Sequence, residues 1–310
     1  MKKINIYELN SLYREPMRVE GYEYGEGEKS VCVVGSMRGN EIQQLFACSK
    51  LIQRLKQLEE KGCIVEGKSI LVIPCINTYS MNIGKRSWST DNTDINRMFP
   101  GYSEGETTQR IAAGVFEKIK DYKYGIQFAS NYMAGSFLPH IRMMRTGFED
   151  VETAKKFEFP YVVVRNTRPF DTTTLNYNWQ IWETKAFSIF TTSTESIDAV
   201  SAKNAVKGIE RMLNAEGVIR SSIAGGYHYN SQVLDDERLI SVRCAEAGIY
   251  ENKVSVGDEV YEGQVLARIT DPYEGTLKEE LVSPADGTVF FLHNAPLVYA
   301  STAVMKLVVE

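Results

Sequence analysis

SVCVVGSMRGNEIQQLFACSKLIQRLKQLEEKGCIVEGKSILVIPC, residues 30–75, is the stretch that decides the fold. It opens with a short apolar run that ends at Gly35, which is the pattern of a buried central strand. Residues 41–61 carry apolar side chains at helical spacing, and residues 69–75 form a second apolar run. A strand, a helix and a strand within ~45 residues predict a βαβ crossover and a largely parallel sheet.

Outside this unit, the same patterns predict further elements. Apolar side chains at helical spacing predict helices over residues 106–120, 150–157 and 198–216. Apolar or alternating runs predict strands over residues 123–129, 160–165 and 186–194. Residues 1–29 indicate an entry strand and a turn at Gly25–Gly27, whereas residues 76–106 look irregular. We therefore expect an α/β/α sandwich about a mixed, mostly parallel sheet.

The character of the sequence changes towards the C-terminus. Residues 237–310 hold short β-like runs separated by Gly and Pro, and one half echoes the other. This pattern predicts an α/β domain over residues 1–228 and an all-β barrel-sandwich module over residues 229–310, similar to a biotinyl or lipoyl module. No lysine lies in the tight turn that such a modification needs, and Lys278 is expected to be a solvated surface residue.

The composition limits the partners and the location. The chain has 310 residues, of which 43% are hydrophobic and 24% charged, as in an ordinary soluble globular protein. Its five cysteines form no CxxC pair and are expected to be reduced and structural. The net charge of -5 argues against a nucleic-acid partner. Since no run reaches signal-peptide length or the ~20 apolar residues of a membrane span, we expect a cytoplasmic protein without a membrane partner. A homo-oligomer stays open.

Four segments carry the side chains for chemistry. They are GSMRGNE (35–41), the long loop 77–101, GIQFAS (125–130) and TSTES (192–196) with Glu195. Each follows a predicted strand. Ligand sites of open α/β sheets lie at the carboxyl ends of strands, so these segments are expected to meet there.

The order of these segments resembles the succinylglutamate desuccinylase/aspartoacylase branch of the zinc carboxypeptidase-like enzymes. That family's first motif has the form G-x-x-H-G-x-E, its loop carries D-L-N-R-x-F-P-G after an arginine, and its third motif is D-L-H. The sequence DINRMFPG, residues 94–101, matches the loop motif. The resemblance covers residues 30–215 and implies a zinc-dependent hydrolase that cleaves the amide or ester bond of an N-acyl amino acid. A C-terminal β-module is also typical of some branches.

The resemblance also implies roles for individual residues. Glu41 occupies the position of a zinc ligand, and Glu195 occupies that of the general base acting on zinc-bound water. Three residues occupy positions that bind the substrate carboxylate, namely Arg86, Asn96 and Arg97. Arginine suits this task because it can hold a carboxylate through two parallel hydrogen bonds. The implied partner is a small-molecule carboxylate or an N-acyl amino acid.

The zinc-ligand positions depart from the family pattern. Arg38 stands where the first histidine is expected, and Ala129 stands where the last one is expected, with Gln127 in place of the preceding aspartate. Zinc sites of this kind use histidine and carboxylate ligands. Arginine is always protonated and only donates hydrogen bonds, and alanine has no ligand atom. His140 is a weak candidate for a replacement ligand, and a structural or substrate-contacting role is its alternative.

Arg38 suggests another use of the same place. Without zinc, Glu41 and Glu195 would leave negative charge in the cleft, where like charges are costly. Arg38 is therefore predicted to hold its guanidinium where the metal would lie and to pair with Glu41, with Glu195 as a further candidate partner. Asp94 is predicted to orient an arginine or to cap the loop.

Three functions stay open on the sequence alone. The first is an N-acyl amino acid hydrolase with a relocated metal site, and the second is a relative without zinc that binds a small carboxylate. The third is an assembly role through the β-module. The family resemblance favours the first, and the residue chemistry favours the second. Residues 168–184, rich in aromatic and amide side chains, fit a pocket lining, a buried loop or a partner surface equally well.

Overall fold

The protein was analysed as a computed structural model that describes residues 1–13, 15–130, 132–223 and 225–309. The chain divides into two compact units. The first consists of Met1–Ser130 and Pro139–Val233, and the second of Asn131–Leu138 and Leu234–Glu310. The second unit therefore takes one short segment from the middle of the sequence.

The first unit is built on a nine-stranded sheet with the strand order β1-β2-β4-β3-β5-β9-β7-β8-β10. Its strands are β1 (Lys2–Leu9), β2 (Met17–Gly25), β3 (Gly27–Ser36), β4 (Gly67–Cys75), β5 (Tyr124–Ala129), β7 (His140–Arg145), β8 (Tyr161–Asn166), β9 (Lys185–Phe190) and β10 (Gln232–Asp235). Strand β3 runs parallel to β4 and β5, β5 runs parallel to β9, and β7 runs parallel to β8. Strands β1 and β2 pair antiparallel, as do β2 with β4 and β7 with β9. The mixed, mostly parallel sheet expected from the sequence is confirmed.

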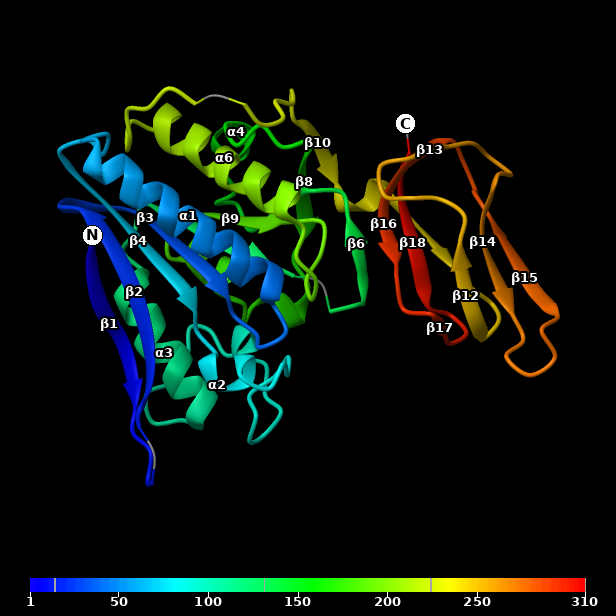
Figure 1. Cartoon of the computed structure of the whole chain (residues 1–310), viewed down its shortest axis with the longest axis horizontal. Coiled ribbons are helices and arrows are strands. Elements are labelled where there is room, and N and C mark those ends of the chain that lie inside the picture. The colour runs from blue at the N-terminus through cyan, green and yellow to red at the C-terminus, as the bar shows by residue number, and fades with distance from the viewer. Residues whose placement is uncertain (14, 131, 224, 310) are drawn as a thin grey trace. The chain divides into compact units, whose positions relative to one another are not determined.

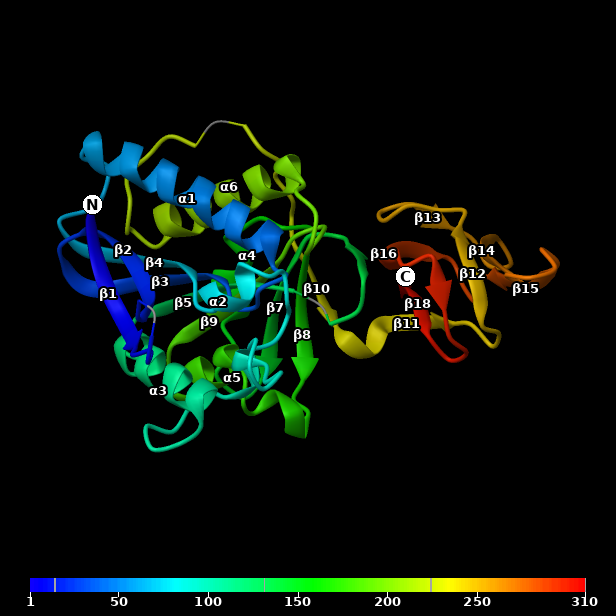
Figure 2. The same ribbon diagram turned by 60° about the horizontal axis from the view of Figure 1, so that its bottom comes forward.

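Helices cover both faces of this sheet, as Figures 1 and 2 show. Their bounds are α1 (Ile42–Glu60), α2 (Thr78–Met81), α3 (Thr107–Ile119), α4 (Val151–Lys155), α5 (Leu175–Ile181) and α6 (Ala199–Ala215), with 3-10 turns η1 (Ile95–Arg97) and η2 (Pro169–Asp171). One apolar core joins α1 and α6 to one face of the strands. A second core joins α3 and α5 to the other face. The α/β/α sandwich predicted from the sequence is therefore present.

Several elements differ from the sequence-based expectation. Strand β9 ends at Phe190, so Glu195 lies in the loop after the strand and not at its end. The N-terminal segment holds two strands, β1 and β2, where one was expected. Residues 168–184 hold the helix α5, where the sequence left a pocket lining, a buried loop and a partner surface open. Thr174 caps this helix by accepting a hydrogen bond from the Tyr177 amide, and Trp179 is fully buried. Tertiary packing thus stabilises a helix too short to be marked by its own periodicity.

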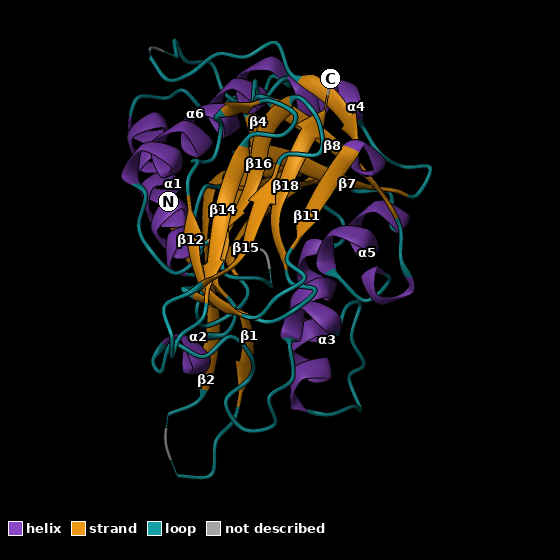
Figure 3. Cartoon of the chain, turned by 90° about the vertical axis from the view of Figure 1, so that its right-hand side faces the viewer, coloured by secondary structure: helices purple, strands orange, loops and turns teal. Residues whose placement is uncertain are grey.

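The second unit contains two antiparallel sheets (Figure 3). The first pairs β11 (Leu239–Arg243), β18 (Ala303–Val309), β16 (Gly287–His293) and β13 (Glu259–Val260), with β6 (Gly135–Phe137) on β16. The second pairs β15 (Leu277–Val282), β14 (Val265–Thr270), β12 (Gly248–Asn252) and β17 (Leu297–Val298). One 3-10 turn, η3 (Asp236–Arg238), precedes them. Lys278 donates to the Ala247 carbonyl and pairs with Glu246 at the surface.

Candidate functional site

The turn between β3 and α1 forms the base of the site. It follows the carboxyl end of a central strand, and every residue from Ser36 to Gly39 is buried. Gly39 lies against the loop that follows β4, since a Cβ there would come within 2.2 Å of the Ser80 carbonyl carbon and 2.3 Å of the Lys85 oxygen. No larger residue fits without moving that loop. The turn and the loop are therefore packed backbone against backbone.

Glu41 accepts hydrogen bonds on both of its carboxylate oxygens. One oxygen accepts from the Met37 and Arg38 amides at 2.7 and 3.0 Å. The other accepts from the Arg38 guanidinium at 2.9 Å and from the Ser130 hydroxyl. Glu41 is also the N-cap residue of α1, yet its side chain does not cap the helix. Its carboxylate, which is fully buried, is committed to the turn.

Arg38 lies between two carboxylates. Its side chain is 5% exposed, and its NH1 atom lies 2.9 Å from Glu41. Its Nε donates to both Asp94 oxygens at 3.0 and 2.9 Å, and its NH2 lies 2.9 Å from the same carboxylate. Burial by itself would lower the pKa of Arg38, but the charges of Glu41 and Asp94 outweigh it and raise the pKa. The expected contact with Glu41 is present, and the second carboxylate that pairs with Arg38 is Asp94, where Glu195 had been a candidate.

Asp94 connects this ion pair to the loop 77–101. Its side chain accepts from the Asn96 amide at 3.1 Å and so caps η1. It also lies 3.6 Å from the NH2 atom of Arg86. Burial and then the charge of Arg38 lower the pKa of Arg86, while Asp94 works in the opposite direction. Asp94 therefore does both things predicted for it, orienting arginines and capping the loop.

Asn96 and Arg97 tie the same loop to β5 and to the start of α5. The Asn96 side-chain oxygen accepts from Gln127 and from the Leu175 amide, both at 3.3 Å. Arg97 donates to the Phe170 carbonyl, and its guanidinium lies 5.2 Å from the centre of the Phe170 ring. The arginines of the loop stay partly open to solvent, with side chains 29% exposed at Arg86 and 34% at Arg97. Arg97 also lies 3.8 Å from Asp171, and Asn96 is buried and fixes the loop.

Glu195 lies at the edge of this site. It is exposed, and it accepts a hydrogen bond at 2.7 Å from Asn40, the residue next to Glu41. The four segments singled out in the sequence thus come together at the carboxyl ends of β3, β4, β5 and β9. The hydrogen bond between Asn40 and Glu195 joins the fourth segment to the first.

His140 occupies a different environment from a metal ligand. It is fully buried at the start of β7, and its ring stacks on Phe190 at 4.7 Å. Its Nε2 atom lies 3.1 Å from the NH2 atom of Arg142. Because a guanidinium only donates, Nε2 accepts this hydrogen bond and its lone pair is engaged.

The residues of the site do not fit the zinc ion that the family resemblance implies. Arg38 is a fixed cation, Ala129 has no ligand atom, and the Glu41 oxygens already accept four donors. Among the residues that the structure describes, no three His, Cys, Asp or Glu side chains are placed to hold one metal ion. The donor set is that of an ion-pair network, since a hydrolytic zinc site needs three protein ligands and an open position.

One hydrogen bond within the site and one buried amide next to it in the chain were not predicted from the sequence. Ser130 donates to Glu41, although only its place after Ala129 could have indicated this. Asn176 lies in α5 beside Leu175, which binds Asn96. Its side-chain oxygen and nitrogen are both buried and have no hydrogen-bond partner among the described residues. Buried amides are normally paired, so this one is notable next to the loop.

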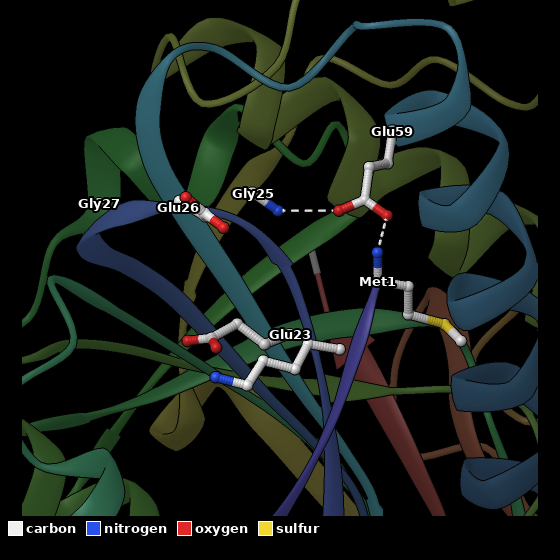
Figure 4. A pocket seen from close by; sticks show the side chains of 7 residues that line it. Met1, Glu23, Gly25, Glu26, Gly27 and Glu59 are labelled. Carbon is white, nitrogen blue, oxygen red and sulfur yellow. Dashed lines mark hydrogen bonds and ion pairs between the residues drawn. The ribbon is translucent and has the colours of Figure 1, made fainter.

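A pocket elsewhere in the first unit is lined by acidic groups (Figure 4). It lies where β2 ends and β3 begins, at the amino ends of the parallel strands. Glu59 accepts from the Gly25 amide at 3.0 Å and from the Met1 amine there. Because ligand sites of such sheets lie at the carboxyl ends, we do not assign the function to this pocket.

Comparison with known proteins points to one family. The model of the succinylglutamate desuccinylase/aspartoacylase catalytic domain matches residues 27–215. An N-alpha-acetyl-L-2,4-diaminobutyric acid deacetylase of Halomonas elongata is 24% identical over 271 residues, which cover 80% of this chain and 72% of that protein. No helix of the described ranges is long and apolar enough to cross a membrane.

Solved structures share the fold over nearly the whole chain. The product-bound ectoine utilization protein EutE of Ruegeria pomeroyi superposes with a TM-score of 0.81 at 19% identity, covering 98% of this chain and 93% of that one. A succinylglutamate desuccinylase/aspartoacylase of Rhodobacter sphaeroides gives a TM-score of 0.78 at 19% identity, with 94% and 89% covered. At these identities, the likeness establishes the fold.

Proposed function

The chain belongs to the succinylglutamate desuccinylase/aspartoacylase family, and from that premise we propose that it acts on a small N-acyl amino acid and hydrolyses its amide bond. The match of the catalytic domain over residues 27–215 carries the proposal, because this range includes every residue of the strand-end site. The Halomonas elongata relative, named as a deacetylase of an acetylated diamino acid, makes an N-acetyl amino acid the first substrate to test. We place the protein in the cytoplasm, where such small metabolites are found.

The loop supplies the groups that would recognise the substrate. Arg86 and Arg97 are partly exposed guanidinium groups on one loop, and either can hold a carboxylate through paired hydrogen bonds. Asn96 supports them by fixing η1 against β5 and α5. Glu195 is an exposed carboxylate at the same edge and is our candidate to accept a proton from the attacking water.

A second candidate function is recognition of the same ligand without hydrolysis. The observation that favours it is the full engagement of Glu41 by four donors, with Arg38 in the position where the family places a histidine. A carboxylate in this state has no free oxygen for a metal, and no other zinc ligand adjoins it in the family positions. The catalytic power that the family draws from a metal is then missing, while the carboxylate-binding loop is retained.

A substrate panel separates the two candidates. Purified protein is incubated with N-acetyl-L-2,4-diaminobutyrate, N-acetyl-L-aspartate and N-succinyl-L-glutamate, with and without a chelator, and the free amino acid is measured by mass spectrometry. Turnover that Glu195→Gln reduces by about a hundredfold or more supports hydrolysis. Ligand-induced thermal stabilisation that Arg97→Ala abolishes, without turnover, supports binding alone. Neither turnover nor stabilisation with any compound would overturn both.

The double variant Arg38→His/Ala129→His tests the cause of the difference. It restores two histidines beside Glu41 and removes the competing guanidinium, so we expect it to retain about one zinc ion per chain after dialysis. The unchanged protein should retain none at this place. Elemental analysis of both proteins, with Ala129→His alone as the matched control, measures this directly. Zinc held equally by all three would show that the metal lies elsewhere.

A further inference from the structure

Four charged groups of the site stand in a line of alternating sign. Glu41 pairs with Arg38 at 2.9 Å, Arg38 pairs with Asp94 at 2.9 Å, and Asp94 lies 3.6 Å from Arg86. The line starts on the turn after β3 and ends on the loop 77–101. Exposure increases along it, from 0% at the Glu41 side chain to 29% at Arg86. A charge held in the buried interior is therefore connected to a charge that a ligand can reach.

Arg38 joins the two segments, because it pairs with Glu41 of the turn and with Asp94 of the loop. Its guanidinium is planar and can direct one edge to Glu41 and another to Asp94, which a spherical ammonium group cannot do. Asp94 in turn caps η1, the turn that carries Asn96 and Arg97. The conformation of the ligand-binding residues thus depends on a guanidinium that is itself too deeply buried to touch a ligand.

We propose that Arg38 is a positioning residue that fastens the loop 77–101 to the turn after β3 through its ion pairs with Glu41 and Asp94. The identity of the ligand rests on the function proposed above, whereas the fastening of the loop does not. Two consequences follow. The loop keeps its arrangement in the presence of a chelator, and a change at Arg38 weakens ligand binding through Arg86 and Arg97.

Hydrogen exchange of the ligand-free protein tests the fastening. In Arg38→Ala, the amides of residues 77–101 should exchange about tenfold faster or more, because Asp94 loses its main partner and opens with the loop. Arg54→Ala is the matched control, since it removes another arginine paired with a fully buried glutamate, Glu210, outside the site. It should leave exchange in residues 77–101 unchanged. Addition of chelator should not alter either result.

Chemical rescue separates positioning from a general loss of stability. Alanine at position 38 leaves a space of the shape of the missing group, and ethylguanidinium at low millimolar concentration should restore slow exchange in the loop. Ethylurea, which is similar in shape and uncharged, should not. Where an N-acetyl amino acid binds the unchanged protein, its Kd should rise about tenfold or more in Arg38→Ala and recover with ethylguanidinium.

Each result decides the matter. Faster loop exchange that ethylguanidinium reverses and ethylurea does not supports the proposal, even if no substrate is found and the proposed function fails. Unchanged loop exchange in Arg38→Ala overturns it. Equal rescue by ethylurea also overturns it, because filling the space would then be sufficient. If Arg38→Ala does not fold, Arg38→Lys is used, for which partial loosening of the loop at an unchanged melting temperature is expected and unchanged exchange again overturns the proposal.

Discussion

Two arginine–glutamate pairs, one at the N-terminus of α1 and one within it, differ in what they connect. At the start of α1, Glu41 pairs with Arg38, and further along α1, Arg54 pairs with Glu210 of α6. Both glutamates are fully buried. The helix pair, Arg54–Glu210, joins α1 to α6 on one face of the sheet. Glu210 has a second cationic partner, Lys207, which comes from α6 itself. The strand-end pair continues instead to Asp94 and to a partly open arginine on a long loop.

The two pairs differ in their place in the fold and in the groups to which they continue. Both glutamates are fully buried and each is paired with an arginine, so these two features alone do not distinguish the pairs. The strand-end pair differs from the helix pair in its place at the carboxyl ends of parallel strands. It also differs because it continues to a partly exposed arginine. Water access differs too, since the Arg38 side chain is 5% exposed and the Arg54 side chain 24%. Removing one partner of the strand-end pair should therefore lower the free energy of unfolding more than removing one partner of the helix pair.

Removing one negative charge from each pair should give the largest effect. Glu41→Gln leaves Arg38 with Asp94 alone in a dry environment, and we expect a loss of about 3 kcal/mol in the free energy of unfolding, because a broken buried pair leaves an uncompensated charge. Glu210→Gln should cost less, about 1–2 kcal/mol, because Arg54 and Lys207 can turn towards water. Urea unfolding measures both.

Ligand binding separates these two variants more sharply than stability does. Glu41→Gln should also weaken any carboxylate ligand, whereas Glu210→Gln should not. Equal losses of stability, together with unchanged binding in both, would remove the distinction between the two pairs.

The sequence was sufficient for the fold because its central elements are long and strongly patterned. The run of residues 30–36 and the helical spacing of residues 41–61 correspond to β3 and α1 within a few residues. The helix α5 was missed because its seven residues are held by Trp179 against the sheet, which no local pattern reveals. Strand β7, HIRMMR, was missed because its charged residues hide the alternation.

The site was predictable only where a motif fixed the positions. The loop motif DINRMFPG placed Asn96 and Arg97, and simple charge balance placed Arg38 beside Glu41. The choice of Asp94 as the second partner depends on how the loop folds back, with its backbone against Gly39. That approach is set by tertiary structure, so no spacing in the sequence could separate Asp94 from Glu195 as the partner.

A smaller change tests how far Glu41 depends on its neighbours. Ser130→Ala removes the hydroxyl that donates to Glu41 and leaves three donors in place. A hydrogen bond to a charged group is worth about 1.5–3 kcal/mol, and the remaining donors should reduce the loss to about 1 kcal/mol. Ser49→Ala is the control, because this hydroxyl donates to the Phe46 carbonyl within α1. A loss no greater than that of Ser49→Ala would place Ser130 outside the network.

The smallest effect on the free energy of unfolding is expected at a third ion pair, Lys156–Glu216, at the C-terminus of α6. Glu216, the C-cap residue of α6, lies 2.5 Å from Lys156 and accepts from the Tyr124 hydroxyl. Burial tends to raise the pKa of Glu216, but the bonds from Lys156 and Tyr124 prevail and lower it. A lowered carboxyl pKa stabilises the folded state above the unfolded pKa, and this stabilisation is lost as the pH falls through the folded pKa.

Lys156→Met should therefore lower the free energy of unfolding by less than about 1 kcal/mol at pH 7, because the Lys156 side chain is 41% exposed and solvent screens the pair. The difference from the unchanged protein should shrink as the pH falls below about 4.5, where Glu216 becomes protonated in the unfolded chain. Urea unfolding at a series of pH values measures this. A loss of free energy of unfolding as large as that of Glu41→Gln, or one that grows on acidification, would contradict this. The exposure of the three pairs to water would then not determine how much each stabilises the fold.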